Sequence, residues 1–196
     1  MTPRRIALTG GIACGKSLLC RFLERLGWEV LDADDVAHSL ISPEERARLA
    51  ATVFRDAAAR RALEARLHPE ILRRILAWFD APPVPRADGR PCAGKIAAIP
   101  LLFEVHWEKY FDTIVCVVAS REKQIERLTA LRGHTREEAE ERLSAQMDAG
   151  EKASRSCYAI RNDGSAEQLE AEAAKCALWL ARRAASGEGA ASYGKE

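Results

Sequence analysis

The sequence predicts an α/β fold in which a five-stranded parallel sheet lies between two layers of helices. Short apolar runs, the expected strands, alternate along the 196 residues with stretches of helical spacing. One run, residues 113–118, has no polar residue after Thr113, which is typical of a strand buried on both faces. Residues 10–17 follow another run and read G-x-x-x-x-G-K-S, a phosphate-binding loop. Together these observations predict the three-layer fold of P-loop nucleoside triphosphatases.

The phosphate-binding loop has the expected neighbours on both sides. The run Ile6-Ala7-Leu8 is typical of a buried strand, and apolar residues recur at helical spacing from Leu18 to Leu26. Glycines allow the loop backbone to turn successive N–H groups toward an anion, and the helix N-terminus adds partial positive charge. Lys16 is expected to reach the β- and γ-phosphates, and the Ser17 hydroxyl to bind Mg²⁺. The pattern therefore predicts a nucleoside triphosphate site.

A group of carboxylates follows the second expected strand, residues 28–31. The strand ends in Asp32-Ala33-Asp34-Asp35, and residues 36–40 begin a helix. Open α/β sheets bind their ligands at the carboxyl ends of the strands, so we expect one of these aspartates to face the phosphate site. An aspartate before a helix commonly caps its N-terminus, and at least one is expected to do so.

Residues 43–79 are expected to be helical and to form a small cap on the sheet domain. Their apolar residues follow helical spacing up to Phe79, and Pro69 is expected to begin a new helix. His68 precedes Pro69, and a lone histidine there is more often a cap or surface residue than a catalyst. The proline- and glycine-rich residues 80–94 are expected to form an exposed loop.

The second half of the chain continues the alternation of strands and helices. Strands are expected over residues 95–99 and 113–118, separated by the segment that begins Pro100-Leu101-Leu102-Phe103-Glu104. The helix expected over 120–132 turns Ile125, Leu128 and Leu131 inward and Gln124, Arg127 and Arg132 outward. Thr135 and Glu138 have capping-box spacing and begin a helix over 136–147. This helix is highly charged and weakly apolar, which predicts a mobile lid over residues 133–152.

The last strand is expected over residues 157–160 and the last helix over 165–184. Residues 186–196 are small and polar and are expected to be disordered. Residues 1–185 would then form a single P-loop domain. Its core comprises 1–35, 95–132 and 155–185, its cap 36–79 and its lid 133–152.

Composition limits the other classes of function. The net charge is +1 without a long basic run, so no nucleic-acid partner is expected. No apolar stretch approaches the length of a membrane span, and the few residues before the first strand leave no room for a signal peptide. A cytoplasmic protein, monomeric or weakly oligomeric, is the expectation. The six cysteines have no metal-site or disulfide spacing, and Cys14 is better interpreted as a small residue tolerated in the loop than as a reactive thiol.

The motifs that are absent narrow the type of phosphate chemistry. The chain has neither the Asn-Lys-x-Asp of regulatory GTPases nor the Leu-Ser-Gly-Gly of transporter ATPases. A small kinase remains, which needs a base near an acceptor hydroxyl and positive charge around the transferred phosphoryl group. Two other hypotheses stay open, a P-loop kinase for a nucleoside or nucleotide and a catalytically weak ATP-binding regulatory protein.

The chain resembles the dephospho-CoA kinases over most of residues 5–165. The matching pieces, in family order, are Leu8–Ile12 with Gly15-Lys16-Ser17, Leu31–Asp34, Leu67-His68-Pro69, Pro100–Glu104, Gln124 with Arg127, Arg142 with Gln146, and Asn162 with Gly164. The resemblance implies transfer of the ATP γ-phosphate, with Mg²⁺, to the 3′-hydroxyl of dephospho-CoA.

The resemblance also implies roles for individual residues. Asp34 is the candidate base, Lys16 and Arg142 complete the catalytic set, and Asp32 would assist Ser17 at the metal or support the fold. The acceptor would be bordered by Asp34, His68, Leu101, Phe103 and Glu104, and Asn162 would lie near the adenine. The implied ATP-binding set is Gly10, Gly11, Ile12, Ala13, Cys14, Gly15, Lys16, Ser17, Leu18, Arg127, Arg132 and Asn162.

The chain departs from the family pattern in three places. Ser156-Cys157 replaces the usual Ala-Asp before the fifth strand, and Leu18 replaces the usual threonine after the loop serine. The stretch between Ala37 and Leu63 is shorter than usual. Because this stretch belongs to the acceptor cap, its shortness is expected to weaken the binding of the acceptor rather than of ATP.

Overall fold

The computed structural model describes residues 4–42, 44, 57–86 and 88–186 of the chain. The chain divides into two compact units, one made of Met1–Val30 with Pro83–Glu196 and the other of Leu31–Pro82. The first unit holds the phosphate-binding loop, and the second contains the predicted cap.

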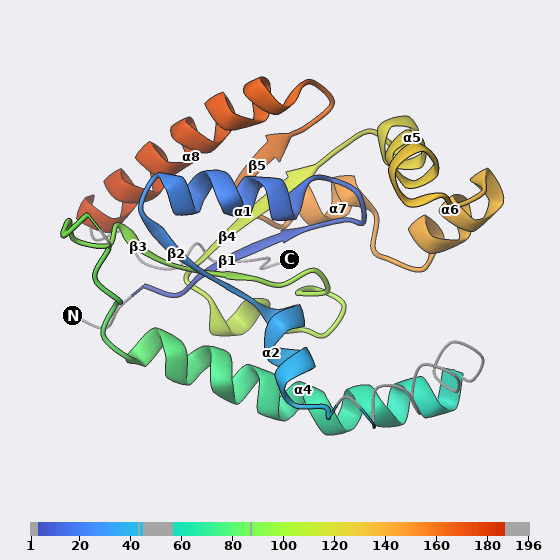
Figure 1. Cartoon of the computed structure of the whole chain (residues 1–196), viewed down its shortest axis with the longest axis horizontal. Coiled ribbons are helices and arrows are strands. Elements are labelled where there is room, and N and C mark those ends of the chain that lie inside the picture. Colours follow the sequence, from blue (N-terminus) through green and yellow to red (C-terminus); the bar gives the residue numbers. More distant parts are fainter. Residues whose placement is uncertain (1–3, 43, 45–56, 87, 187–196) are drawn as a thin grey trace. The chain divides into compact units, whose positions relative to one another are not determined.

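The sheet has five strands in the order β2-β3-β1-β4-β5 (Figure 1). Their bounds are Ile6–Gly10 for β1, Trp28–Asp32 for β2, Gly94–Ala98 for β3, Thr113–Val118 for β4 and Tyr158–Arg161 for β5. β1 pairs in parallel with β3 and β4, and β4 pairs in parallel with β5. All five residues of β1 are buried, because neighbouring strands flank both of its edges and the helices α1 and α7 of the first unit contact it. The predicted five-stranded parallel sheet is confirmed.

In the described part of the first unit, five α-helices accompany the strands. They are α1 (Lys16–Arg25), α5 (Arg121–Arg132), α6 (Arg136–Ser144), α7 (Ala149–Ser154) and α8 (Ala166–Ser186), with a 3-10 turn η1 at Glu108–Tyr110. α1 and α8 pack side by side on one face of the sheet (Figure 1). Alternate strand residues such as Leu8, Ile96 and Val117 share a buried core with Leu19 of α1 and Leu180 of α8.

The remaining strand residues, such as Cys116, point to the other face of the sheet. α7 contacts β1, β4 and β5 there, and its Lys152 is among the charged groups that act on Cys116. Helices therefore cover both faces of this sheet, which explains why its central strands β1 and β4 contain no charged residue.

Local signals placed most helix ends correctly. Gly27 and Gly133 take positive φ values of 97° and 69° at the ends of α1 and α5. Thr135 and Glu138 form the predicted capping box of α6. α6 nevertheless ends at Ser144 rather than at residue 147, and the short helix α7 was not predicted. The Asp148 carboxylate caps α7 by accepting from the N–H groups of Gly150 and Glu151.

The predicted faces of α5 were partly wrong. Leu131, expected inside, is 78% exposed, whereas Gln124, expected outside, is only 5% exposed. Ile125 and Leu128 are buried as expected, against Ala139 of α6 and Ile12 and Ala13 of the loop. The loop therefore decides which side of α5 is buried, and it presents polar backbone groups that a glutamine can bind.

In the second unit, α2 (Ala33–Ser39) begins directly after β2. The Asp32 carboxylate caps it and accepts from the Asp34 N–H at 3.0 Å, which confirms the predicted aspartate cap. α2 packs against α4 (Ala57–Asp80), and Arg74 of α4 donates to the Ser39 hydroxyl at 3.0 Å. The predicted helix over 43–56 lies outside the described residues, except for Glu44, which is helical.

Pro69 does not begin a new helix, so this prediction was wrong. α4 continues through Pro69 over 24 residues. A proline inside a helix removes one hydrogen bond and crowds the carbonyl four residues earlier. The helix persists because Ile71, Ile75 and Phe79 bury one face after the proline, while Glu70 binds both Arg73 and Arg74.

Replacing the exposed Pro69 by alanine is expected to stabilise the protein. The new N–H can donate to the Ala65 carbonyl, and the ring clash disappears, so the free energy of unfolding should rise by about 1–3 kcal/mol. Urea unfolding followed by circular dichroism measures this change. A lower stability of Pro69→Ala would show that the ring makes contacts worth more than the missing hydrogen bond.

Candidate functional site

The phosphate-binding loop connects β1 to α1 and has the backbone of an anion cradle. Ala13 and Gly15 take left-handed conformations, with φ values of 58° and 94°, and the Cys14 N–H donates to the Gly11 carbonyl at 3.2 Å. Such alternation turns successive N–H groups to one side of the chain. Lys16 and Ser17 open α1, where the helix dipole also favours an anion. The loop can therefore bind phosphate groups.

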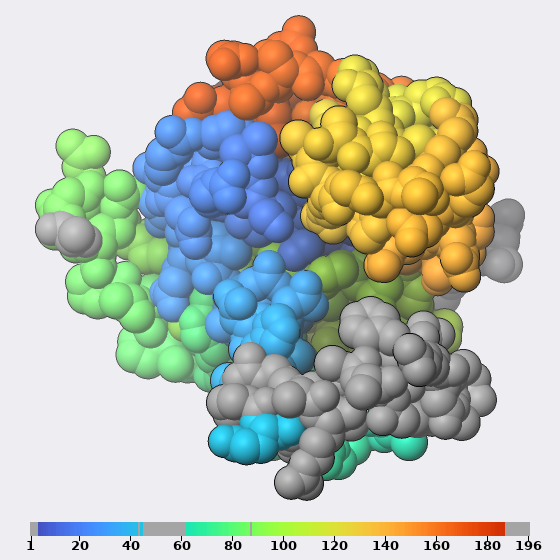
Figure 2. Space-filling view, turned by 45° about the vertical axis from the view of Figure 1, so that its right-hand side comes forward, coloured from blue at the N-terminus to red at the C-terminus, as the bar shows by residue number. Residues whose placement is uncertain are grey.

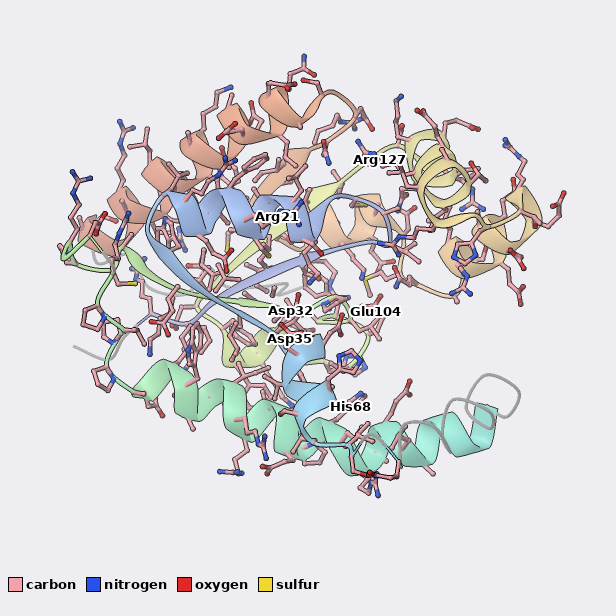
Figure 3. All side chains as sticks on the ribbon, viewed as in Figure 1. Arg21, Asp32, Asp35, His68, Glu104 and Arg127 are labelled. Carbon is pink, nitrogen blue, oxygen red and sulfur yellow. The ribbon has the colours of Figure 1, made fainter. Side chains whose placement is uncertain are left out.

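Side chains from distant segments bind three consecutive carbonyls of this loop. Gln124 Nε2 donates to the Ile12 carbonyl at 2.7 Å, and Arg127 Nη1 donates to the Ala13 carbonyl at 3.2 Å. Asn162 Nδ2 donates to the Cys14 carbonyl at 2.9 Å. We call Gln124, Arg127 and Asn162 the carbonyl clamp. Figure 3 shows Arg127 projecting from α5.

One further contact joins two members of the clamp, and another joins the segment after α6 to the loop. Arg127 Nη2 donates to the backbone carbonyl of Asn162 at 2.8 Å, so the guanidinium bridges two members of the site. Gln146, just after α6, accepts from the Ile12 N–H at 2.9 Å. In the space-filling view, α5 and α6 form one continuous surface, yellow to orange, beside the blue loop and α1 (Figure 2).

A buried lysine organises the turn that follows β3. Lys152 of α7 is fully buried, and its ammonium lies 2.7 Å from Glu104 Oε1 and 2.9 Å from the Pro100 carbonyl. The same carbonyl accepts from the Thr9 hydroxyl of β1, and Glu104 Oε1 also accepts from the Met147 N–H. One ion pair thus joins the turn, the strand before the loop and the segment after α6.

A second ion pair lies beside the first. Arg155 donates to Glu108 Oε1 at 2.8 Å, and its guanidinium carbon lies 4.5 Å from the centre of the Phe103 ring. Phe103 is fully buried, whereas Leu101 and Glu104 retain some exposed surface. Within the described part of the chain, Glu104 Oε2 is buried and accepts no hydrogen bond. The buried Phe103 ring and the two ion pairs therefore hold this turn together.

The second unit carries the carboxylates and the histidine expected near the acceptor. Asp32 and Asp35 lie at the start of α2 and His68 on α4 (Figure 3). Asp34 is exposed in the first turn of α2, and His68 is half-buried. The Asp32 cap fixes the backbone of Asp34, so the position of Asp34 on its helix follows from a local interaction.

The structure brings some predicted residues together and leaves others apart. Arg127 and Asn162 meet at the loop backbone, while Arg132 and Arg142 are exposed on α5 and α6. Sequence reasoning gave no role to Gln124 or Gln146, although both belong to the quoted family resemblance. It missed Lys152 entirely, because a lysine in a short charged segment carries no signal of burial.

Cys14 is not a reactive thiol in this structure. Its side chain is fully buried, and burial raises the pKa of the thiol despite nearby backbone hydrogen bonds and the charge of Arg127. A raised pKa keeps the thiol protonated and therefore weakly nucleophilic. All six cysteines are free thiols. The structure thus favours the interpretation of Cys14 as a small residue tolerated in the loop.

The donor set of the predicted metal site fits Mg²⁺. The Ser17 hydroxyl and the Asp32 carboxylate are hard oxygen donors, which this ion prefers. The described residues contain no group of three histidines, cysteines or carboxylates that could hold a metal without further ligands. Among the same residues, no helix has the length and apolar character that a bilayer crossing needs.

The parallel sheet, the loop after β1 and the helix that follows define a P-loop protein of the small kinase class. A family model described as dephospho-CoA kinase matches residues 4–47 and 44–168. A dephospho-CoA kinase of Geobacter sulfurreducens is 39% identical over 187 residues, which cover 84% of this chain and 92% of that relative. The chain belongs to the dephospho-CoA kinase family.

Solved structures agree with this assignment. The crystal structure of TT1252 from Thermus thermophilus is 32% identical, has a TM-score of 0.71 and is matched over 92% of this chain and 98% of its own. A dephospho-CoA kinase from Campylobacter jejuni shares the fold at a TM-score of 0.60 and 22% identity, over 93% of this chain and 100% of its own. The predicted P-loop fold is confirmed.

Removing the buried ammonium should destabilise the protein strongly. Lys152→Met leaves the Glu104 carboxylate without its counter-ion, and breaking such a pair costs about 3–5 kcal/mol. The double variant with Glu104→Gln should recover much of this loss, because no uncompensated charge remains. Urea unfolding of the single and double variants measures both effects.

The matched control is Lys175→Met, which breaks a comparable pair with Glu172. The Lys175 side chain is 66% exposed and that of Lys152 is 0% exposed, so the control should cost at most about 1 kcal/mol. Equal losses for the two lysine variants would contradict the assigned role of Lys152.

Proposed function

We infer that this chain transfers the γ-phosphoryl group of ATP to the 3′-hydroxyl of dephospho-CoA, giving coenzyme A and ADP. The observation that carries this proposal is the family match, which includes the loop, all five strands and every helix up to the start of α8. The fold supports it with a phosphate-binding loop, and the second unit supports it with an exposed aspartate.

On the nucleotide side, the loop amides would bind the phosphates and Lys16 would neutralise charge on the β- and γ-phosphates. Mg²⁺, bound through Ser17 and Asp32, would supply Lewis-acid stabilisation of the charge on the phosphate oxygens. Arg132 and Arg142 would add positive charge when the part of the predicted lid that precedes Gln146, which contains α6, closes over the phosphates while Lys152 stays in its buried ion pair. Arg142 is exposed on a helix whose residues are almost all exposed or half-buried, which supports such a movement.

On the acceptor side, Asp34 would accept the proton of the attacking hydroxyl as general base. His68, Leu101, Phe103 and Glu104 would border the acceptor, with the buried Phe103 supporting the turn and the partly exposed Leu101 and Glu104 facing the acceptor. The two segments of the family match meet at residues 44–47, within the stretch where the chain is short. We therefore expect a higher KM for dephospho-CoA than in longer relatives, with an ordinary KM for ATP.

Purified protein with Mg-ATP should release ADP much faster with dephospho-CoA than with AMP, CMP, adenosine, pantothenate or shikimate. A coupled assay of ADP formation measures the rates, and mass spectrometry identifies the product. A dephospho-CoA analogue with a 3′-deoxyribose is the matched control, because it keeps every contact except the attacking oxygen.

Equal rates with and without dephospho-CoA would contradict the proposal. Preferential stimulation by a nucleoside or nucleotide would instead favour another P-loop kinase activity. Nucleotide binding without stimulation by any acceptor would favour an ATP-binding regulatory protein.

Asp34→Asn should leave ATP affinity nearly unchanged and lower kcat about 10²–10⁴-fold, the usual contribution of a general base. The Asp32 cap is kept, since it binds the backbone N–H of residue 34 rather than its side chain. Asp35→Asn, on the same exposed turn, is the control and should retain near-normal kcat. Steady-state kinetics with both substrates varied measures kcat and the two KM values of each variant. If Asp35→Asn loses kcat while Asp34→Asn does not, the base has been assigned to the wrong aspartate.

A further inference from the structure

We propose that the carbonyl clamp, Gln124, Arg127 and Asn162, positions the phosphate-binding amides and thereby sets nucleotide affinity. In this proposal Arg127 acts through the loop backbone and not by direct contact with the γ-phosphoryl group. The proposal rests on the ATP-dependent function inferred above and adds positioning residues to its nucleotide site.

The clamp fixes the direction of the loop N–H groups through the geometry of the peptide bond. In a trans peptide, the carbonyl of one residue and the N–H of the next point in opposite directions. The clamp holds the carbonyls of Ile12, Ala13 and Cys14. The next N–H groups in the chain, those of Ala13, Cys14 and Gly15, therefore point away from the clamp. The Cys14 N–H donates to the Gly11 carbonyl within the loop, so the N–H groups of Ala13 and Gly15 are the ones that the clamp directs toward an anion. Each donor of the clamp fixes one peptide plane of the loop.

The loop is strained at Ala13, and the clamp holds it in this conformation. Ala13 has a φ of 58°, a conformation that costs an L-residue about 1–2 kcal/mol. The peptides on both sides of Ala13 are held, by Gln124 before it and by Arg127 after it. Ile12 and Ala13 also pack on Ile125 and Leu128 of α5. These contacts offset the strain, so the loop keeps its binding conformation.

The guanidinium of Arg127 bridges two backbone carbonyls. Nη1 binds the Ala13 carbonyl, and Nη2 binds the Asn162 carbonyl. The Asn162 N–H in turn donates to the Val118 carbonyl at 2.7 Å, which fixes Asn162 at the end of β5. Each terminal nitrogen of Arg127 therefore donates one of its N–H groups to a backbone oxygen, which fixes the plane of the guanidinium. A lysine cannot reproduce this bridge, because its single nitrogen lacks the planar fork of a guanidinium.

The test measures ADP and ATP binding by titration calorimetry without any acceptor, so its result does not depend on which acceptor the enzyme uses. Arg127→Met should weaken ADP and ATP by the same factor, roughly 10–100-fold, as expected for a lost charge-assisted hydrogen bond. Gln124→Met and Asn162→Ala should each weaken both nucleotides about 3–10-fold. Arg127→Lys should restore little of the loss, although it keeps the charge. Arg121→Met, an exposed arginine on the same helix, should bind normally.

A second readout separates positioning from general stability. The ³¹P resonance of the ADP β-phosphorus reports on the donors around it, so it should move in the three clamp variants and not in Arg121→Met. A variant that loses thermal stability but keeps normal ADP affinity and the normal resonance would overturn the proposal. So would an Arg127→Met protein with normal ADP affinity and a loss confined to ATP or kcat, because that result places Arg127 on the γ-phosphoryl group. Failure of the dephospho-CoA assay alone would leave these binding results unaffected.

Discussion

The constraint on which the rest of the structure depends is the direction of the peptide groups between Gly10 and Ser17. An anion cradle needs N–H groups that point inward, and a trans peptide then directs the carbonyls outward. Outward carbonyls in a packed protein need donors, because an unpaired buried polar group costs stability. In this chain the donors come from α5 and from the end of β5. The loop is short in sequence, but its conformation depends on residues more than a hundred positions away.

A buried charge, the ammonium of Lys152, also depends on partners that are distant in sequence. The ammonium of Lys152 is withdrawn from water, and such burial is tolerated only with a counter-ion and hydrogen bonds. Glu104 and the Pro100 carbonyl supply both. Since Thr9 shares that carbonyl and Met147 shares that carboxylate, the turn after β3 is attached both to β1 and to the segment that precedes α7. The turn proposed to border the acceptor is thus held in place by contacts with β1 and with the segment before α7.

The chemistry assigned to the family divides between the two units. The first unit provides the phosphate-binding loop, with amides, Lys16 and a helix N-terminus that all favour negative charge. The second would provide the proposed base Asp34, whose backbone is fixed by the Asp32 cap, and His68 on the continuous helix α4, which is proposed to border the acceptor. Each side chain is positioned by interactions inside its own unit. The stretch between Ala37 and Leu63, expected from the sequence to be shorter than in the family, belongs to the second unit, so we expect the nucleotide site to be independent of it.

The sequence by itself determined the features that depend on local interactions. The motif of residues 10–17, the apolar strands, Gly27 and Gly133 after their helices, and the capping box of α6 all follow from backbone geometry within a few residues. Only the tertiary structure decided which side of a helix is buried. Gln124 is inside and Leu131 outside because α5 packs against the polar backbone of the loop, which periodicity cannot reveal. Pro69 stays within α4 because packing outweighs the preference of proline for the start of a helix. Lys152 is buried because its distant partner Glu104 offsets the cost of removing the ammonium from water.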